Sequence, residues 1–459
     1  MSSETQDATP IETLDQLVDW IRAGEKPAAG HRIGTEHEKF PFYKDTLEPV
    51  PYEGERGIGA LLEGMGEHLG WEPGHDEGRV ISLKGPTGAS ISLEPGGQFE
   101  LSGAPLETLH ETCAESNEHL AAVREVGDRL GIAFLGLGSS PLWSLDETPR
   151  MPRSRYDIMR RYMAKSGAHG LAMMHQSTTI QVNLDFASEA DMRDKIRVGL
   201  KLQPIAAALF ANSPFSEGRP NGLVSVRSDM WRDVDNKRSG TLPVAYRPEF
   251  GYADYVEWAL DVPMYFVVRG ASYIELGDVT FRQFMEGNFD AERRARTGEA
   301  TLGDWINHLG FLFPDVRLKR FLEMRGADGG PWRRICALPA LWVGLLYDEA
   351  ALADAVELTR DWTEPEVRAM RDTVPRDGLR AEAPGGHSVH EIARQTLHIA
   401  ERGLKARARL NTAGLDETDF LAPLAEVVAK GRTQAEELLD RYKGPWEGDV
   451  RRVFAELAY

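Results

Sequence analysis

ISLEPGGQFELS, residues 91–102, is the segment of the sequence most informative about the fold. With the period of a β-strand, Ile91 and Leu93 lie on one side and Glu94 on the other. A bend at Pro95 to Gly97 follows, and Glu100 then returns to a polar side. Taken alone, this pattern leaves two interpretations open: the solvated side of an antiparallel sheet, or one wall of an acidic site.

The same alternation recurs elsewhere in the chain. Glu36 and Glu38 lie two residues apart, and residues 179–186 alternate apolar and polar side chains without a fault. Residues 223–227 are predicted as another strand, as are residues 263–268 and 272–276. The polar positions collected from the predicted strands are Glu36, Glu38, Glu94, Glu100, Gln181, Asn183, Arg227, Glu323 and Arg325.

Helices are predicted between and after these strands. Residues 106–130 carry an apolar stripe that includes Cys113, and residues 155–164 form a short basic helix beginning at Arg155. From residue 331 onward the chain is mostly helical. We therefore predict an α+β fold, with residues 1–459 as a single catalytic domain, residues 1–30 as a helical lead-in and residues 331–459 as a helical cap on the sheet.

The composition narrows the classes of partner. The 459 residues include 53 Lys and Arg against 72 Asp and Glu, a formal net charge of -19, which argues against nucleic acid or an anionic membrane as a partner. Two cysteines exclude a disulfide scaffold and a cysteine-based zinc site, and they favour a reducing compartment. The first residues lack the features of a signal or transit segment, so a cytoplasmic location is expected.

Five carboxylates on one face of a sheet would repel one another unless a cation neutralised them. Mg²⁺ suits such a site because it prefers oxygen ligands and completes its shell with phosphate oxygens and water. Carboxylates, Mg²⁺ and arginines together are typical of phosphoryl transfer. Phosphate-loop, dinucleotide-binding, zinc-protease and serine-hydrolase motifs are all lacking in the sequence.

Several long motifs, taken in order, resemble one family. They are GTEHEKF (34–40), GGQFELSGAPLETLHETCAE (96–115), QVNLDF (181–186), LFANSPF (209–215), DVPMYF (261–266) and EMRGADGGPWRRICALPA (323–340). The chain resembles the plant-type glutamate-cysteine ligase family, which has plant and proteobacterial members. The resemblance implies a glutamine-synthetase-like core, in which a curved antiparallel sheet cradles Mg²⁺ and ATP and is surrounded by helices.

The resemblance also implies roles for individual residues. Arg325 and Asn183 would face the nucleotide, with Arg325 and Arg227 acting in catalysis; Arg155 and Arg227 would hold substrate carboxylates, and Tyr265 and Trp332 would wall the cysteine pocket. Cys113 and Cys336 stand where plant members carry a pair that can form a disulfide; in a cytoplasmic protein we expect a pair of thiols. The implied metal ligands are Glu36, Glu38, Glu94, Glu100, Gln181 and Glu323.

The function so implied is the ATP- and Mg²⁺-dependent joining of L-glutamate to L-cysteine through γ-glutamyl phosphate, the first step of glutathione synthesis. A ligase for another amine, a Mg²⁺-dependent small-molecule phosphotransferase and a catalytically dead nucleotide-binding protein are the alternatives. We expect small-molecule substrates, no nucleic acid or membrane partner, and a monomer or weak homodimer.

Overall fold

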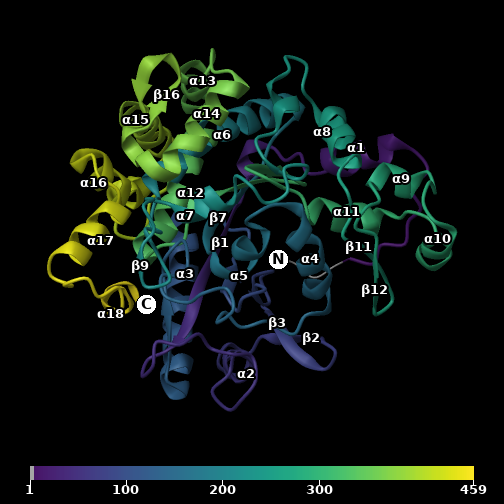
Figure 1. The fold of residues 1–459 in the computed structure, drawn as a ribbon. Helices are drawn as coiled ribbons and strands as arrows, with labels where there is room; N and C mark the ends of the chain where they lie inside the picture. Colours follow the sequence, from purple (N-terminus) through teal and green to yellow (C-terminus); the bar gives the residue numbers. More distant parts are fainter. Residues whose placement is uncertain (1–4) are drawn as a thin grey trace.

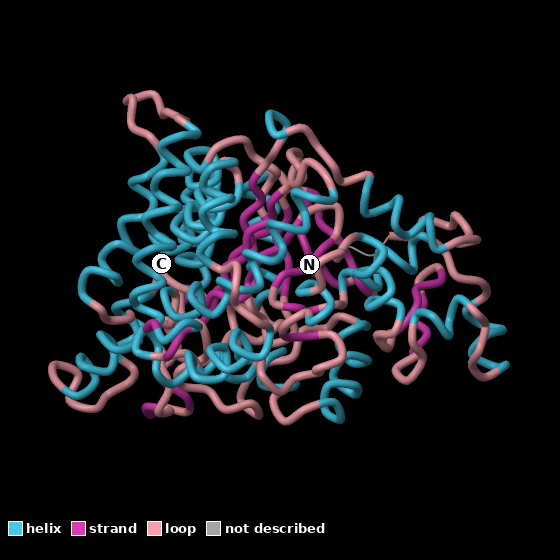
Figure 2. Tube along the Cα trace, turned by 90° about the horizontal axis from the view of Figure 1, so that it is seen from above, coloured by secondary structure: helices cyan, strands magenta, loops and turns pink. Residues whose placement is uncertain are grey.

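The computed structural model describes residues 5–459, and one antiparallel sheet organises them. Within this described part, nine strands form the sheet in the order β14-β15-β7-β1-β5-β4-β3-β2, and β6 pairs with the second half of β1. Figures 1 and 2 show the strands gathered at the centre with helices around them. The strands are β1 (Ile33–Tyr43), β2 (Glu72–Asp76), β3 (Arg79–Lys84), β4 (Ser90–Leu93), β5 (Phe99–Ser102), β6 (Ile132–Leu135), β7 (Thr179–Leu184), β14 (Val316–Leu318) and β15 (Leu322–Asp328).

The register of these strands explains why the alternating sequences fold together. Ile180, Val182 and Leu184 of β7 are fully buried, and Leu322 and Met324 of β15 are at most 1% exposed. Their apolar side faces helices, so the polar residues between them share the opposite side of the sheet. The predicted antiparallel sheet is therefore confirmed.

Long helices cover the apolar face. Contacts join α12 to β1 and β7, α6 to β15, and α3 to β1 and β6. The helices are α1 (Leu14–Arg22), α2 (Ile58–Leu69), α3 (Leu109–Leu130), α4 (Ser154–Ser166), α5 (Gly170–Gln176), α6 (Glu189–Leu209), α7 (Val226–Met230), α8 (Tyr252–Leu260), α9 (Phe281–Met285), α10 (Ala291–Thr297), α11 (Leu302–Gly310), α12 (Trp332–Leu346), α13 (Glu349–Leu358), α14 (Glu364–Asp377), α15 (Val389–Arg407), α16 (Ala422–Lys430), α17 (Gln434–Lys443) and α18 (Arg452–Leu457).

Two strand predictions need correction. Residues 223–227 do not form a strand: Ser225 caps α7, its hydroxyl accepting a hydrogen bond from the Ser228 amide, so Arg227 lies on a helix. The predicted strands near Tyr265 do form, but as a separate hairpin of β11 (Phe266–Arg269) and β12 (Ser272–Glu275). The remaining short strands are β8 (Phe215–Ser216), β9 (Arg219–Pro220), β10 (Ser239–Gly240), β13 (Phe313–Pro314), β16 (Glu382–Ala383) and β17 (His387–Ser388).

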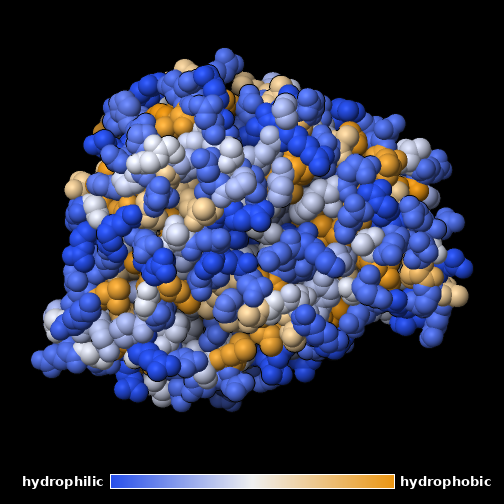
Figure 3. Space-filling view, turned by 45° about the horizontal axis from the view of Figure 1, so that its top comes forward, coloured by the Kyte–Doolittle hydropathy of each residue, from blue (hydrophilic) through white to orange (hydrophobic). Residues whose placement is uncertain are grey.

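After residue 331 the chain is mainly helical, as expected, and its last helices lie along one side of the molecule in Figure 1. No single helix among the described residues is long and apolar enough to span a membrane; α12 and α13 meet the criterion together, across a bend of 90°. The face in Figure 3 is largely hydrophilic, with hydrophobic residues in small separate groups. The division into one domain with a lead-in and a cap stays a prediction.

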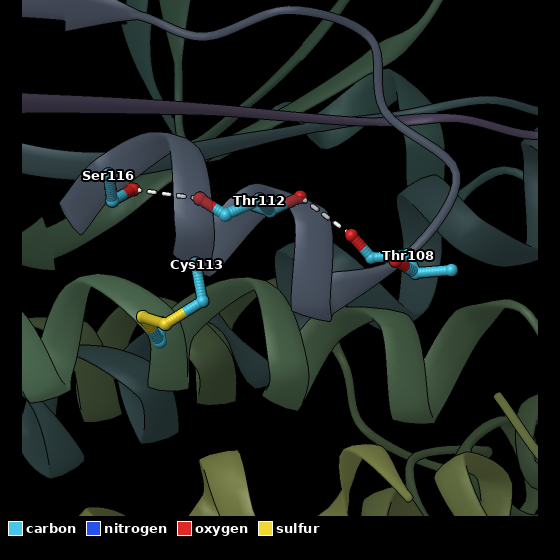
Figure 4. Close-up of a disulfide and its surroundings, with 5 residues drawn as sticks. Thr108, Thr112, Cys113 and Ser116 are labelled. Atoms are coloured by element: carbon cyan, nitrogen blue, oxygen red, sulfur yellow. Dashed lines mark hydrogen bonds between the residues drawn. A yellow bond between two sulfur atoms is a disulfide. The ribbon is translucent and has the colours of Figure 1, made fainter. Parts of the chain in front are cut away.

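The two cysteines form a disulfide, which corrects the expected pair of thiols. Cys113 of α3 and Cys336 of α12 are bonded, with their Cα atoms 5.5 Å apart. Figure 4 shows the bond between the two helices and, on α3, the hydroxyls of Thr112 and Ser116 donating to backbone oxygens one turn back. The bond ties together two helices that both pack beneath β1.

Candidate active site

A cavity of about 260 Å³ lies on the polar side of the sheet. Its floor comes from β1, β5 and β7, and its walls come from α4, α11, α1 and the segment around β14 and β15. Most of the predicted polar positions line it. These are Glu36, Glu38, Glu94, Glu100, Gln181, Arg155 and Arg325.

The strand register brings the acidic residues together in cross-strand pairs. Glu38 of β1 stands opposite Glu100 of β5, and Glu36 stands opposite Gln181 of β7. Direct opposition puts Cβ atoms roughly 5 Å apart. Two contacts orient the β1 carboxylates: Asn183 Nδ2 donates to Glu36 Oε1 at 2.8 Å, and the Thr179 amide donates to Glu38 Oε2 at 3.0 Å.

The acidic side chains strongly affect one another. Burial and the charges of Glu94 and Glu100 raise the pKa of Glu38 well above its usual range. Burial and Glu100 raise the pKa of Glu94 to about 7. Burial, with Glu323 and Glu100, also raises the pKa of Glu36. Without a bound cation, Glu94 therefore titrates near neutral pH.

The bend between Glu94 and Glu100 is held by Gln98, for which the sequence alone assigned no role. The Gln98 amide nitrogen donates to the backbone oxygens of Met174 and Ser177 at 3.1 and 2.8 Å, and its oxygen accepts from the Gly96 amide at 2.9 Å. Gly97 has φ +87°, which suits glycine. Gln98 thus anchors to α5 the bend that separates the two glutamates.

A cationic wall faces the carboxylates. Arg325 Nη1 donates to Gln181 Oε1 at 2.6 Å and also contacts Glu323. Glu323 is fully buried, does not line the cavity, and pairs with Arg317 at 2.7 Å and with Lys319 at 3.4 Å. Burial alone would raise the pKa of Glu323, but the charges of Arg317, Lys319 and Arg325 hold this pKa well below its usual range. Glu323 therefore holds the side chains of Arg317, Lys319 and Arg325 in place.

The two predicted substrate arginines lie in different places. Arg155 is 1% exposed, lines the cavity, and stacks 5.7 Å from the Phe311 ring. Arg227 lines a smaller cavity of about 40 Å³, and Arg325 lines both cavities. The Arg227 Nη2 donates to the Arg325 backbone oxygen at 2.8 Å, so Arg227 of α7 is joined to β15 beside the cavity.

The two predicted aromatic residues do not line the cavity. Tyr265 is buried behind Phe311, with ring centroids 5.6 Å apart, and Phe311 itself lines the cavity. Trp332 is 47% exposed at the start of α12 and is not part of the cavity wall. Tyr265 thus supports the wall from behind, and the structure does not bring Trp332 to the site.

Sequence reasoning missed several residues of the wall. Arg317 lies on β14 and Lys319 lies two residues later, just beyond the strand. This two-residue spacing, which puts both side chains on one face of a strand, could have identified them from the sequence. Phe311 follows α11, Phe313 lies in the two-residue strand β13 and Trp20 lies on α1, so no strand period marked these residues. These aromatic residues became recognisable as wall residues through the tertiary structure.

The donor set of the cavity fits a hard divalent cation. Carboxylate and amide oxygens dominate it, and cation binding would relieve the repulsion that raises the pKa values of Glu38 and Glu94. Among residues 5–459, however, no group of three or more His, Cys, Asp and Glu side chains is arranged to hold a metal ion as it stands. Residues that could hold a cation after small side-chain movements are Glu36, Glu38, Glu94, Glu100 and Gln181.

The family model and the similar known proteins point to one family. Residues 32–456 match the model of glutamate-cysteine ligase family 2. Glutamate–cysteine ligase B, chloroplastic, of Oryza sativa subsp. japonica is 51% identical over 458 residues, covering 100% of this chain and 90% of that protein. The chloroplastic enzyme of Nicotiana tabacum is 51% identical over 462 residues, covering 100% of this chain and 86% of that protein.

A solved structure shares the fold. The glutamate–cysteine ligase of Francisella tularensis in complex with AMP superposes with a TM-score of 0.55 at 13% identity, over 92% of this chain and 86% of that one. The relative from Arabidopsis thaliana is 51% identical, over 98% of this chain and 84% of that protein. This relative and those from Oryza sativa and Nicotiana tabacum are all named chloroplastic, which corrects the expected cytoplasmic location.

Proposed function

Since the chain belongs to glutamate-cysteine ligase family 2, we propose that it joins glutamate to cysteine in an ATP-dependent reaction, as the first step of glutathione synthesis. One observation carries the proposal: carboxylates from β1 and β5 and from the bend between β4 and β5 share one cavity with Arg155 and Arg325. That arrangement offers sites for cations, for phosphates and for amino-acid carboxylates.

The proposed reaction has two steps. The side-chain carboxylate of glutamate attacks the γ-phosphorus of ATP, forming γ-glutamyl phosphate and releasing ADP. The amine of cysteine then attacks the acyl carbon, forming the amide bond as the C–O bond to phosphate breaks and the amine gives up a proton. ATP thus converts a poor electrophile into a good one, and the protein supplies position and charge.

Arg325 is the residue we assign to the transferring phosphoryl group. It lies at the cavity wall, and the ion pair with Glu323 limits its movement. A guanidinium fixed in advance stabilises charge on the phosphoryl oxygens without the cost of reorganisation. We assign Glu323 to this positioning role, since binding a metal would require Glu323 to give up part of its contacts with three cations.

Arg155 and Arg227 are assigned to substrate carboxylates, because both are buried and a guanidinium binds a carboxylate in a bidentate way. Asn183, which holds Glu36, is assigned to the nucleotide side of the site. Tyr265 is assigned to support of Phe311 at the cysteine pocket.

Glu36, Glu38, Glu94, Glu100 and Gln181 are the residues we propose to hold Mg²⁺. When bound, the metal would neutralise charge on the phosphates of ATP and on the departing ADP. The carboxylates must lose their protons before they bind it, so metal affinity is expected to rise with pH.

The test uses the purified chain with ATP, Mg²⁺ and glutamate, with and without cysteine. Release of phosphate and ADP that depends on both amino acids, together with the mass of γ-glutamylcysteine, supports the proposal. A phosphorylated acid as the final product would point to a phosphotransferase, and turnover with a different amine but none with cysteine would point to another ligase. Chelation of Mg²⁺ should abolish turnover and re-addition should restore it. Gel filtration would test the proposed monomer or weak homodimer.

A further inference from the structure

The cavity has two chemically different ends along β1. Leu322, Leu184 and Ile33 stand side by side across β15, β7 and β1, and the turn between β14 and β15 lies beyond them. Moving along β1 from that end, Glu36 comes first and Glu38 second. The carboxylates therefore lie progressively farther from the turn, and Arg325 follows the same direction on β15.

At the end near the turn, the cavity wall is apolar and aromatic. Trp20 of α1, which contacts the turn through Arg320, and Phe321 of the turn line this end; Ile306 of α11 lines the same cavity, and each of the three is partly exposed. Lys319 lies between this wall and the acidic end, with Nζ 5.3 Å from the Phe321 ring and 3.4 Å from Glu323. A cation at this boundary is suited to a phosphate.

Trp20 is held in place by the turn itself. Arg320 Nε donates to the Trp20 backbone oxygen at 3.1 Å, and the Arg320 guanidinium lies 4.7 Å from the Trp20 ring centroid. A Cβ on Gly24 would come within 2.4 Å of the Arg320 backbone oxygen, so glycine permits the close approach of α1 to the turn. The indole is therefore a fixed part of the wall.

Residues 5–11 lie against α11, next to the part of that helix that contributes Ile306 to the cavity. Thr5 lines the cavity, and the Asn307 side chain holds Thr5 through two hydrogen bonds of 2.9 Å, from the Thr5 amide and to the Thr5 oxygen. The amides of Gly303 and Ile11 donate to Asp7 and Ala300. A Cβ on Gly303 would lie 2.7 Å from the Asp7 oxygen, so glycine allows this segment to lie flat on α11. We call residues 5–11 the strap.

We propose that the end of the cavity walled by Trp20, Ile306 and Phe321 binds the nucleoside of the nucleotide, and that the strap closes over it. This inference rests on the proposed function, in which a nucleoside triphosphate is a substrate. A flat base is stabilised by stacking on aromatic and aliphatic side chains, whereas the phosphates of the nucleotide need the cations and metal ligands farther along β1. The nucleotide would then run from Trp20 past Lys319 to Arg325.

The first test separates binding of the base from binding of the phosphates. Equilibrium dialysis would measure Mg²⁺-ADP binding, and competition would measure Mg²⁺-pyrophosphate binding. Trp20→Ala should weaken Mg²⁺-ADP about tenfold or more, from the loss of stacking, and leave pyrophosphate unchanged. Trp20→Phe should restore most ADP affinity. Trp258→Ala, at a tryptophan of similar burial on α8, should change neither.

The second test concerns the strap. Asn307→Ala removes both hydrogen bonds to Thr5 and should speed ADP dissociation several-fold in stopped-flow measurements, with faster proteolysis within residues 5–11. An unchanged ADP dissociation rate would refute closure by the strap.

Equal weakening of ADP and pyrophosphate by Trp20→Ala, or no change in either, would refute the nucleoside site, as would a wild-type chain that does not bind Mg²⁺-ADP. These measurements need no chemical turnover. A chain that binds ADP as described but makes no γ-glutamylcysteine would therefore refute the proposed function and leave the nucleoside site intact.

Discussion

Glu94 provides a way to measure the charge repulsion in the cavity. Its pKa of about 7 lies above the ordinary glutamate value of 4.5, so the folded, metal-free chain holds this proton more tightly than the unfolded chain does. Stability attributable to Glu94 is therefore present at low pH and is lost as pH rises from 4.5 through about 7. Glu94→Gln removes the titrating group and keeps the shape of the side chain.

The size of the effect follows from the shift. The full difference corresponds to on the order of 3 kcal/mol, and the part that falls between pH ~5.5 and pH ~8 is about 2 kcal/mol. Urea unfolding in the presence of EDTA would give the free energy of unfolding at both pH values. Wild type should lose about 2 kcal/mol more than Glu94→Gln between them.

Two controls sharpen this measurement. Glu53→Gln, at an exposed carboxylate whose partner is Arg79, should behave as wild type. Excess Mg²⁺ should restore stability to wild type at the higher pH, because ligand binding to the folded state stabilises it. Parallel pH profiles for wild type and Glu94→Gln would show that Glu94 is not under the repulsion described here.

Other predictions concern activity and stability separately. Glu100→Gln should lower kcat by about 100-fold or more while the thermal unfolding curve stays close to wild type, and near-normal turnover would remove Glu100 from the metal ligands. Arg227→Ala should raise the KM for glutamate or cysteine by about tenfold or more in steady-state assays; an unchanged KM with a lower Tm would make Arg227 structural. Cys113→Ser with Cys336→Ser should lower the free energy of unfolding by about 2–4 kcal/mol, measured by urea titration without reductant, and equal stability would contradict the role of the disulfide.

The sheet and its acidic residues were predictable because the period of two is local. Glu36 and Glu38, or Glu94 and Glu100, reveal their common side within a few residues of sequence. The alternation of residues 223–227 has the same period, but the hydroxyl of Ser225 caps a helix there, and that choice depends on what packs around the segment. Local alternation over five residues does not separate these outcomes.

Other features depend on contacts distant in sequence. Trp332 is exposed because the buried side of α12 begins two residues later, at Arg334. Trp20 belongs to an amphipathic helix whose sequence does not reveal that one of its residues borders a cavity. The disulfide joins residues 223 positions apart, so its formation follows from how α3 and α12 cross beneath the sheet.

The strand order also has a consequence for synthesis of the chain on the ribosome. β1 can pair with β5, β6 and β7 once the first 184 residues have emerged, but β14 and β15 join the sheet only after residue 328. Arg317, Lys319 and Arg325 are therefore synthesised after the glutamates of β1 and β5. If β1 and β5 pair before that stage, their glutamates lack these three cations, so the last strand pair completes the charge balance as well as the fold.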